Sequence, residues 1–238
     1  MEVSSHALDQ YRVANIKFNV GVFTNITPEH LDYHSSMEDY YQAKSKLFKT
    51  LRKNDLAIIN NDNESGKRLL SEVKSSALLF SKNNKNTIHF SNYNLSLDGI
   101  EGNIKADKSI YHIKSYLIGK YNQENILAAV SILHSLKLKK KYIENGINEC
   151  KHIPGRLESF KLLTGAKAVM DYAHTPDAYK NVLSTLKELL MKSSKLYVVF
   201  GAGGERDKYK RPKMAQIAEL FANKCFITPD NPRNENIE

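Results

Sequence analysis

"LYVVFGAGGERDKYKRP", residues 196–212, joins a short apolar run to a glycine loop and then to a basic segment of helical character. The run Leu196–Phe200 is typical of a strand, and the glycines that follow permit a tight exit from it. The loop is not a Walker-type phosphate loop, because Glu205 and Arg206 stand where Lys-Ser or Lys-Thr is required. Strand, glycine turn and helix in this order predict an α/β fold with a mainly parallel sheet.

The same order extends over most of the chain. Between residues 88 and 117, apolar and polar residues alternate as they do in antiparallel strands that bury one face. "HIPGRLE" (152–158) contains the Pro and Gly of a domain boundary, and Thr175 with Pro176 predicts the start of a helix. We expect strands at 19–26, 55–60, 77–80, 166–174, 196–200 and 224–228, and helices at 37–53, 64–73, 123–136, 139–150, 175–192 and 212–221.

Composition narrows the class of protein. The 238 residues are 41% hydrophobic, which is enough for a buried core, and carry 35 Lys+Arg against 26 Asp+Glu. The lysines are spread along the chain, as in "KLKKKY" (137–142), so a solvated helix face accounts for them better than nucleic-acid binding does. Cys150 and Cys225 are far apart in the sequence, which favours neither a zinc site nor a disulfide framework. With no membrane-length apolar run and no signal-peptide pattern at the N-terminus, we expect a soluble cytoplasmic protein.

Lys44 is placed on the apolar side of a predicted helix. Ser35 and Glu38 have the spacing of a capping box at the start of that helix. One explanation is snorkelling, in which the stem packs and the ammonium reaches water. The other is that burial lowers the pKa of the lysine and leaves a neutral amine able to react with an electrophile. The apolar stripe contains Tyr40, Lys44, Leu47 and Leu51.

"HLDYH" (30–34) has the histidine spacing of a zinc-protease helix but lacks the glutamate beside the first histidine. No third ligand follows at the usual distance, so zinc hydrolysis is rejected. One histidine with carboxylates at a polar turn suits magnesium and phosphate oxygens instead.

Eight stretches occur in an order that is specific as a set. They are "MEVSSHALDQYRV" (1–13), "VFTNITPEHLDYH" (22–34), "YYQAKSKLF" (40–48), "YNQENILAA" (121–129), "PGRLE" (154–158), "DYAHTPD" (171–177), "FGAGGERDKYKRP" (200–212) and "DNPRNE" (230–235). Together they resemble the Mur ligases, most of all the UDP-N-acetylmuramoyl-tripeptide synthetase branch, from Glu2 to Glu235. The resemblance implies part of a central ATP-binding domain over residues 1–153 and the first part of a Rossmann-like C-terminal domain over residues 154–238.

The resemblance also implies a reaction. In this family ATP phosphorylates the terminal carboxylate of a UDP-muramoyl-dipeptide, and the amine of an incoming amino acid attacks the acyl phosphate. Glu2 and His30 resemble ligands of a catalytic Mg²⁺, and Lys44 stands where the family carries a carbamylated lysine. That modification would explain the lysine on the apolar face, since a neutral buried amine takes up CO2. The positions that resemble contacts to the UDP-muramoyl substrate are Ser4, Gln10 and Arg12.

Four further positions resemble nucleotide contacts: Asn125, Arg156, Asp171 and His174. Without the family match, Asn125 would be interpreted as a helix-start amide and Asp171 as a turn-forming residue.

The glycine loop resembles part of the amino-acid site, where Arg206 would hold the carboxylate of the incoming substrate. "DNPR" would supply the rest of the site through Asp230, Asn231, Pro232 and Arg233. An arginine at position 233 is associated in the family with meso-diaminopimelate rather than lysine, because a distal carboxylate needs a bidentate cation and an ammonium would be repelled. The alternative is that Asp-Asn-Pro only forms a turn.

Two departures from the family pattern affect the expected activity. No Gly-Lys-Thr loop occurs in the 238 residues, since "SGKRLL" (65–70) and "IGKYNQ" (118–123) lack the hydroxyl residue. Without the groups that hold ATP phosphates and Mg²⁺, we expect this chain to be a middle piece of a ligase, monomeric and nearly inactive by itself. The alternatives are a non-catalytic remnant or binding module of the same family, and a folylpolyglutamate synthetase-like ligase.

Overall fold

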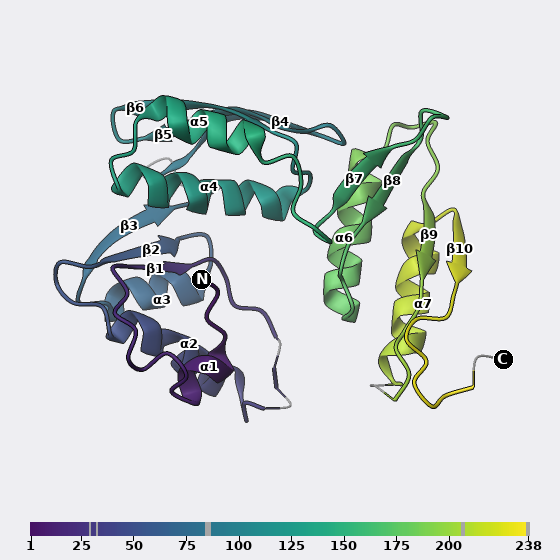
Figure 1. The fold of residues 1–238 in the computed structure, drawn as a ribbon, viewed down its shortest axis with the longest axis horizontal. Coiled ribbons are helices and arrows are strands. Elements are labelled where there is room, and N and C mark those ends of the chain that lie inside the picture. Colours follow the sequence, from purple (N-terminus) through teal and green to yellow (C-terminus); the bar gives the residue numbers. More distant parts are fainter. Residues whose placement is uncertain (29, 32, 84–86, 206–207, 237–238) are drawn as a thin grey trace. The chain divides into compact units, whose positions relative to one another are not determined.

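The computed structural model describes residues 1–28, 30–31, 33–83, 87–205 and 208–236 (Figure 1). The chain divides into two compact units, and each is discontinuous in sequence. Each unit is described by itself. The first contains Met1–Tyr93, Gly102–Ile113 and Gln123–Ile147, and the second contains Asn94–Glu101, Lys114–Asn122 and Asn148–Glu238.

The first unit is built on a parallel sheet with the strand order β1-β2-β3. Helices α2 and α3 connect the strands and lie on one face of the sheet, while α4 lies on the other (Figure 1). Such a sheet is covered on both faces, which explains why Ile58 and Ile59 of the central strand are fully buried. The bounds are β1 (Val20–Phe23), β2 (Leu56–Asn60), β3 (Ser76–Phe80), α2 (Met37–Lys49), α3 (Glu64–Glu72) and α4 (Lys120–Ser135).

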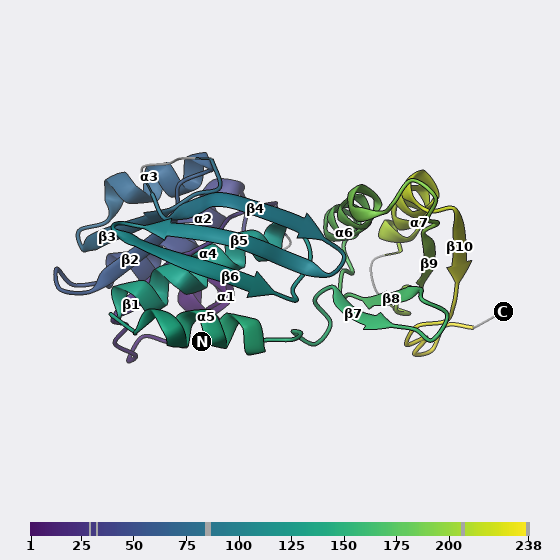
Figure 2. The ribbon, with the colours of Figure 1, turned by 90° about the horizontal axis from the view of Figure 1, so that it is seen from above.

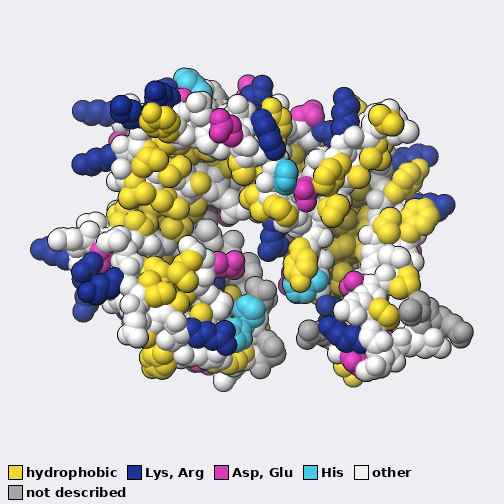
Figure 3. Space-filling model, viewed as in Figure 1, with side chains coloured by type: hydrophobic (Ala, Val, Ile, Leu, Met, Phe, Trp, Pro, Cys, Tyr) yellow, Lys and Arg dark blue, Asp and Glu magenta, His cyan; other side chains and the backbone are white. Residues whose placement is uncertain are grey.

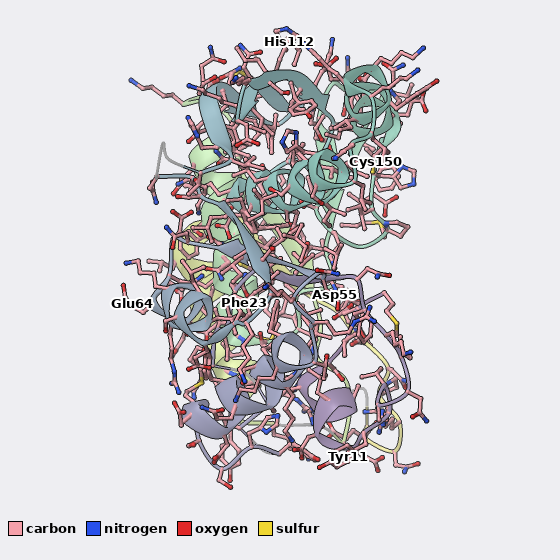
Figure 4. All side chains as sticks on the ribbon, turned by 90° about the vertical axis from the view of Figure 1, so that its left-hand side faces the viewer. Tyr11, Phe23, Asp55, Glu64, His112 and Cys150 are labelled. Carbon is pink, nitrogen blue, oxygen red and sulfur yellow. The ribbon has the colours of Figure 1, made fainter. Side chains whose placement is uncertain are left out.

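The main apolar core of this unit lies between the sheet and α2. The rings of Phe23, which is labelled in Figure 4, and Phe48 meet edge to face with centroids 6.0 Å apart, and both residues are buried. A side chain at Gly21 would come within 3.2 Å of both Phe48 and Leu51, so the glycine lets α2 approach β1 closely. The other buried members of the cluster are Ala57, Ile59 and Leu69.

The start of α2 differs from the sequence prediction by one residue. Ser36, not Ser35, is the N-cap, and its hydroxyl oxygen accepts from the backbone N–H of Asp39 at 3.1 Å. The helix also ends at Lys49 rather than at residue 53. Leu51 lies beyond the helix but is still buried, so the apolar stripe continues past the end of the helix that it predicted.

A second sheet has the strand order β4-β5-β6, and two-residue connections make consecutive strands antiparallel. Its strands are β4 (His89–Ser96), β5 (Gly99–Ala106) and β6 (Ser109–Ser115), and they lie over α4 and α5 (Lys140–Glu149) (Figure 2). Burial alternates along β6, where Tyr111 and Ile113 are buried and His112 and Lys114 are exposed. The alternating stretch 88–117 therefore forms the one-sided strands that its pattern predicted.

The second unit contains two short pairs of strands and two helices. Strands β7 (Glu158–Lys161) and β8 (Lys167–Met170) pair antiparallel, and β9 (Tyr197–Phe200) pairs parallel with β10 (Lys224–Ile227). Helices α6 (Pro176–Leu189) and α7 (Lys210–Phe221) pack side by side (Figures 1 and 2). Their shared core contains Tyr179, Leu183, Val198, Met214 and Ala218.

Two details of the second unit connect it to the sequence. Thr175 caps α6 by accepting from the backbone N–H of Ala178 at 3.3 Å, as the Thr-Pro pair predicted. The tip of the β4–β5 hairpin also belongs to this unit, because Lys167 Nζ donates to the Leu97 carbonyl at 2.6 Å and to Asp98 Oδ1 at 2.7 Å.

The predicted fold class is confirmed: the chain is α/β with parallel and antiparallel sheets. Lys and Arg side chains stand at many separate places on the face seen in Figure 3. None of the helices that the structure describes has the length and apolar character of a membrane span.

Candidate active site

Aromatic side chains gather in the first unit between α1 (Ser5–Asp9) and the start of α2. The ring of His6 lies 4.8 Å from that of His30 and 4.1 Å from that of Tyr33, measured between centroids. His34 stacks on Tyr40 at 5.3 Å and 22°. We call this group of rings the histidine cluster. One predicted site residue, His30, belongs to it, and another, Lys44, lies beside it.

His34 is the buried centre of the histidine cluster, with 6% of its surface exposed. Its Nε2 lies 2.9 Å from the hydroxyl oxygen of Ser5, which is also buried. Burial lowers the pKa of His34, and the positive charge of a protonated His6 would lower it further. His34 therefore favours the neutral form, in which one ring nitrogen is a donor and the other an acceptor.

Lys44 and His30 both border the ring of Tyr40. Lys44 is half-buried, with Nζ 5.3 Å from the Tyr40 centroid, and the His30 ring lies 5.8 Å from the same centroid. His30 has a backbone φ of 59°, in the left-handed region where residues other than glycine are uncommon. The structure thus places the two predicted residues on one ring.

Glu2 is exposed in the segment before α1. Among the described residues, no group of three or more His, Cys, Asp or Glu side chains is placed to hold a metal ion. A carbamate on Lys44 would add two oxygen ligands, which are the donors that Mg²⁺ prefers.

The predicted contacts to the muramoyl substrate lie on or beside α1. Ser4 is the N-cap of this helix and accepts from the backbone N–H of Ala7 at 3.1 Å, so it already has a structural role. Gln10 donates to the Tyr33 hydroxyl at 3.3 Å, and Arg12 is exposed in the turn that follows. Ser4, Gln10 and Arg12 are therefore brought to the same end of the unit.

Asp9 is a residue of this region that the sequence interpretation did not single out. Its carboxylate pairs with Lys46 Nζ at 2.6 Å and accepts from the Tyr33 hydroxyl at 3.0 Å. The hydrogen bond from Lys46 lowers the pKa of Asp9. The pair connects α1 to α2, and no local sequence signal joins positions so far apart.

Asp171 is a backbone acceptor in the second unit. Its Oδ1 accepts from the N–H of Ala173 at 2.8 Å, and its Oδ2 accepts from the N–H of Leu157 at 2.8 Å. The first bond is the turn that was the alternative interpretation of Asp171. The Tyr121 hydroxyl also donates to Oδ2 at 3.4 Å, and burial raises the pKa of Tyr121. Asp171 thereby connects the "PGRLE" and "DYAHTPD" stretches.

Arg156 and His174 are exposed near Asp171. The Arg156 guanidinium lies 6.0 Å from the Tyr172 ring centroid, and His174 Nδ1 is 3.1 Å from the Tyr172 carbonyl oxygen. Their charged and polar groups can therefore reach a ligand. Asn125 is exposed in the second turn of α4, which begins at Lys120, so its interpretation as a helix-start amide is wrong.

The glycine loop (Gly201–Glu205) and the DNPRNE loop (Asp230–Glu235) meet at a pocket of about 350 Å³ in the second unit. The Gly204 N–H donates to the Asn231 carbonyl at 2.8 Å, and Arg233 Nη1 donates to the Gly204 carbonyl. Asp230 and Pro232 line the pocket, whereas Arg206 lies outside the described residues. Of the charged residues that line the pocket, Arg211 and Glu235 were given no role from the sequence.

Two features together define the class of protein. One is an α/β unit with a half-buried lysine, and the other is a second unit with a glycine loop beside "DNPR". The sequence model of the Mur ligase middle domain matches residues 1–133, and that of the Mur ligase glutamate ligase domain matches residues 155–238. The chain belongs to the Mur ligase family.

Two relatives of this chain carry the same name. The chain is 40% identical over 242 residues to the UDP-N-acetylmuramoyl-L-alanyl-D-glutamate–2,6-diaminopimelate ligase of Geobacter metallireducens, covering 99% of this chain and 47% of that protein. The ligase of the same name from Trichormus variabilis is also 40% identical, with 100% and 48% covered. The chain therefore spans about half the length of the curated relatives that it matches.

Solved structures agree in fold. A structure of a UDP-N-acetylmuramoyl-L-alanyl-D-glutamate–2,6-diaminopimelate ligase superposes with a TM-score of 0.73 at 32% identity, covering 99% of this chain and 48% of that one. MurF ligase from Thermotoga maritima, in complex with ADP, gives 0.72 at 18% identity, with 95% and 52% covered. FPGS of L. casei gives 0.68 at 18% identity, with 89% and 50% covered, which shows a shared fold alone.

Proposed function

We propose that this chain belongs to an ATP-dependent ligase that joins meso-diaminopimelate to UDP-N-acetylmuramoyl-L-Ala-D-Glu in peptidoglycan synthesis. The observation that carries the proposal is the contact between the glycine loop and the DNPRNE loop, which border a pocket and in which Arg233 donates to the Gly204 carbonyl. Support comes from the name of relatives that are 40% identical over the length of the chain.

The proposed reaction forms an amide bond in two steps. The γ-phosphoryl group of ATP passes to a carboxylate of the terminal D-glutamate of the dipeptide, giving ADP and an acyl phosphate. The amine of diaminopimelate then attacks the acyl carbon, inorganic phosphate leaves, and the amine loses a proton. Both steps build negative charge on phosphate oxygens, which cationic groups of the protein stabilise.

In this proposal Glu2, His30 and a carbamylated Lys44 would hold Mg²⁺, which neutralises phosphate charge when bound. The donor set fits, because carboxylate and carbamate oxygens are hard ligands and His30 and Lys44 border the same Tyr40 ring. Ser4, Gln10 and Arg12 would bind the muramoyl substrate from the end of α1. The nucleotide contacts would be Asn125, Arg156, Asp171 and His174.

Arg233 would select the amino acid. Diaminopimelate presents a carboxylate beside its distal ammonium, where lysine has the ammonium alone, and a guanidinium can hold a carboxylate with two parallel hydrogen bonds. Lysine offers the guanidinium only an uncompensated ammonium, which it repels, so one residue favours one substrate and opposes the other. Arg206, Asp230, Asn231 and Pro232 would complete the amino-acid site.

We further propose a domain boundary between residues 153 and 154, a monomeric protein, and action in the cytoplasm, where ATP is available. Because the 238 residues include no Gly-Lys-Thr loop, we expect slow turnover by this chain alone. Amino-acid binding is therefore a more direct test than turnover.

The test is titration calorimetry of the purified chain with meso-diaminopimelate, L-lysine and L-glutamate. We expect diaminopimelate to bind at least about tenfold more tightly than lysine, a difference of about 1.4 kcal/mol. In Arg233→Lys this preference should fall toward unity. Equal affinity for lysine and diaminopimelate in the unmodified chain would refute the proposed substrate, and preference for glutamate would favour a folylpolyglutamate synthetase-like ligase.

A further inference from the structure

Glu235 is the hub of the contact between the glycine loop and the DNPRNE loop. Its Oε1 accepts from the backbone N–H of Glu205 at 2.8 Å and lies 3.3 Å from Lys208 Nζ. Its Oε2 accepts from Arg211 Nη2 at 2.7 Å. Arg211 Nη2 also donates to the Gly203 carbonyl at 3.2 Å, so one carboxylate holds the glycine loop both directly and through Arg211.

The two loops are held in backbone conformations that need such support. Glu205 and Arg233 have φ values of 51° and 52°, which side chains other than glycine rarely adopt. Strained residues of this kind persist where the surroundings determine them, and they are common at ligand sites. A Cβ at Gly204 would lie 1.9 Å from the Pro232 carbonyl oxygen, so the loops are already in close contact.

Glu235 is ionised under neutral conditions. The hydrogen bonds from the Glu205 N–H, and then from Arg211, lower its pKa to about 2. Hydrogen bonds to an ionised acceptor are stronger than those between neutral groups. Asn234 Nδ2 adds a further tie by donating to Glu205 Oε1 at 2.8 Å.

We infer that Glu235, together with Arg211, is a positioning residue that sets the guanidinium of Arg233 for substrate selection. The path is short: Glu235 fixes the Glu205 N–H, the preceding Gly204 carbonyl is thereby fixed, and Arg233 donates to that carbonyl. Glu235 uses both carboxylate oxygens within the protein and need not touch the substrate. The identity of the ligand rests on the proposed function, whereas the contact between the loops does not.

The test compares Glu235→Gln with Glu219→Gln, which removes the same charge from the exposed face of α7. Amide hydrogen exchange of Gly204 and Glu205 measures the contact between the loops. We expect exchange to rise by about tenfold in Glu235→Gln, because a charge-assisted bond is lost, and to stay within about twofold in Glu219→Gln. Unchanged exchange in Glu235→Gln would overturn the inference.

Substrate selection is measured by the ratio of lysine to diaminopimelate dissociation constants. A defect that is only structural weakens both ligands equally, whereas a misplaced Arg233 should lower the ratio by about tenfold. Glu235→Asp keeps the charge but has a shorter side chain, so its ratio of dissociation constants should lie between those of Glu235→Gln and the unmodified chain. Such a result would also show that a variant at this position folds. Faster exchange with an unchanged ratio would overturn the positioning role. If the unmodified chain bound neither ligand while exchange rose as expected, the contact between the loops would stand and the proposed function would fall.

Discussion

Replacing His34 with alanine tests whether the histidine cluster holds the first unit together. The substitution leaves the buried Ser5 hydroxyl without its 2.9 Å partner and removes the ring stacked on Tyr40. An unsatisfied buried polar group costs about 1–3 kcal/mol, and a lost aromatic pair costs about 0.5–1.5 kcal/mol. The expected loss is therefore about 2–4 kcal/mol of the free energy of unfolding.

Calorimetry provides the measurement. For a chain of this size each kcal/mol corresponds to about 2–4 °C, so the transition of the first unit should fall by about 4–16 °C. Two compact units make two transitions possible, and the second should stay in place. His112→Ala is the control, since His112 is exposed and should cost less than about 0.5 kcal/mol. A transition in His34→Ala within 2 °C of the unmodified protein, as an order-of-magnitude limit, would refute the reasoning.

A double-mutant cycle refines the test. Ser5→Ala alone leaves the His34 ring nitrogen buried without its partner, so it should also destabilise the first unit. Because the double substitution removes both partners, it should cost less than the sum of the two single substitutions by about 0.5–3 kcal/mol. An additive cycle would mean that the 2.9 Å contact contributes no stability.

Three further predictions concern other parts of the chain. Gly204→Ala places a Cβ 1.9 Å from a carbonyl oxygen of the DNPRNE loop, so it should raise the dissociation constant for diaminopimelate about tenfold or more. Gly146→Ala is the control, because its Cβ meets nothing within 4 Å and should leave this constant unchanged. Hydrogen bonds from Arg68 hold the pKa of Glu38 at about 2 against an ordinary 4.5. The contribution of this pair to stability is therefore complete above pH 4.5 and is lost as the pH falls toward 2, so the stability of Glu38→Gln should decline less steeply over that range in an acid titration. ¹³C NMR with labelled bicarbonate should show a carbamate resonance that is absent from Lys44→Gln, and its absence from the unmodified protein would contradict the proposed carbamylation.

The sequence was most informative where a local pattern determines a local structure. The Thr175-Pro176 pair predicts the start of α6 because a hydroxyl acceptor and a preset φ act within one turn. The two adjacent serines before α2 allow two frames for the cap, and the prediction of Ser35 is wrong because Ser36 caps the helix. The two frames differ in whether residue 38 or residue 39 is the third residue of the helix, and helix propensity does not distinguish them.

The sequence was least informative where function depends on contacts between distant segments. Glu235 stands in a stretch that was recognised, yet its role depends on Arg211 and on a backbone N–H thirty positions away. The sequence indicates for His34 only the spacing of a zinc ligand, because nothing nearby in sequence shows that Ser5 lies against it. Such partners follow from the path of the chain in space, so a motif can be located before its supporting residues are known.

The hydrogen bonds of Lys167 to Leu97 and Asp98 have a consequence for the order of events during synthesis. Lys167 follows Leu97 by 70 residues, and ribosomes add about 5–20 residues per second, so the hairpin tip leaves the ribosome about 4–14 s before its partner. Throughout that interval the apolar cluster in which Leu97 packs is incomplete, because Leu186 has not yet been synthesised. The hairpin tip is therefore a place where the nascent chain is open to chaperones, and the second unit cannot finish folding until translation has passed β8.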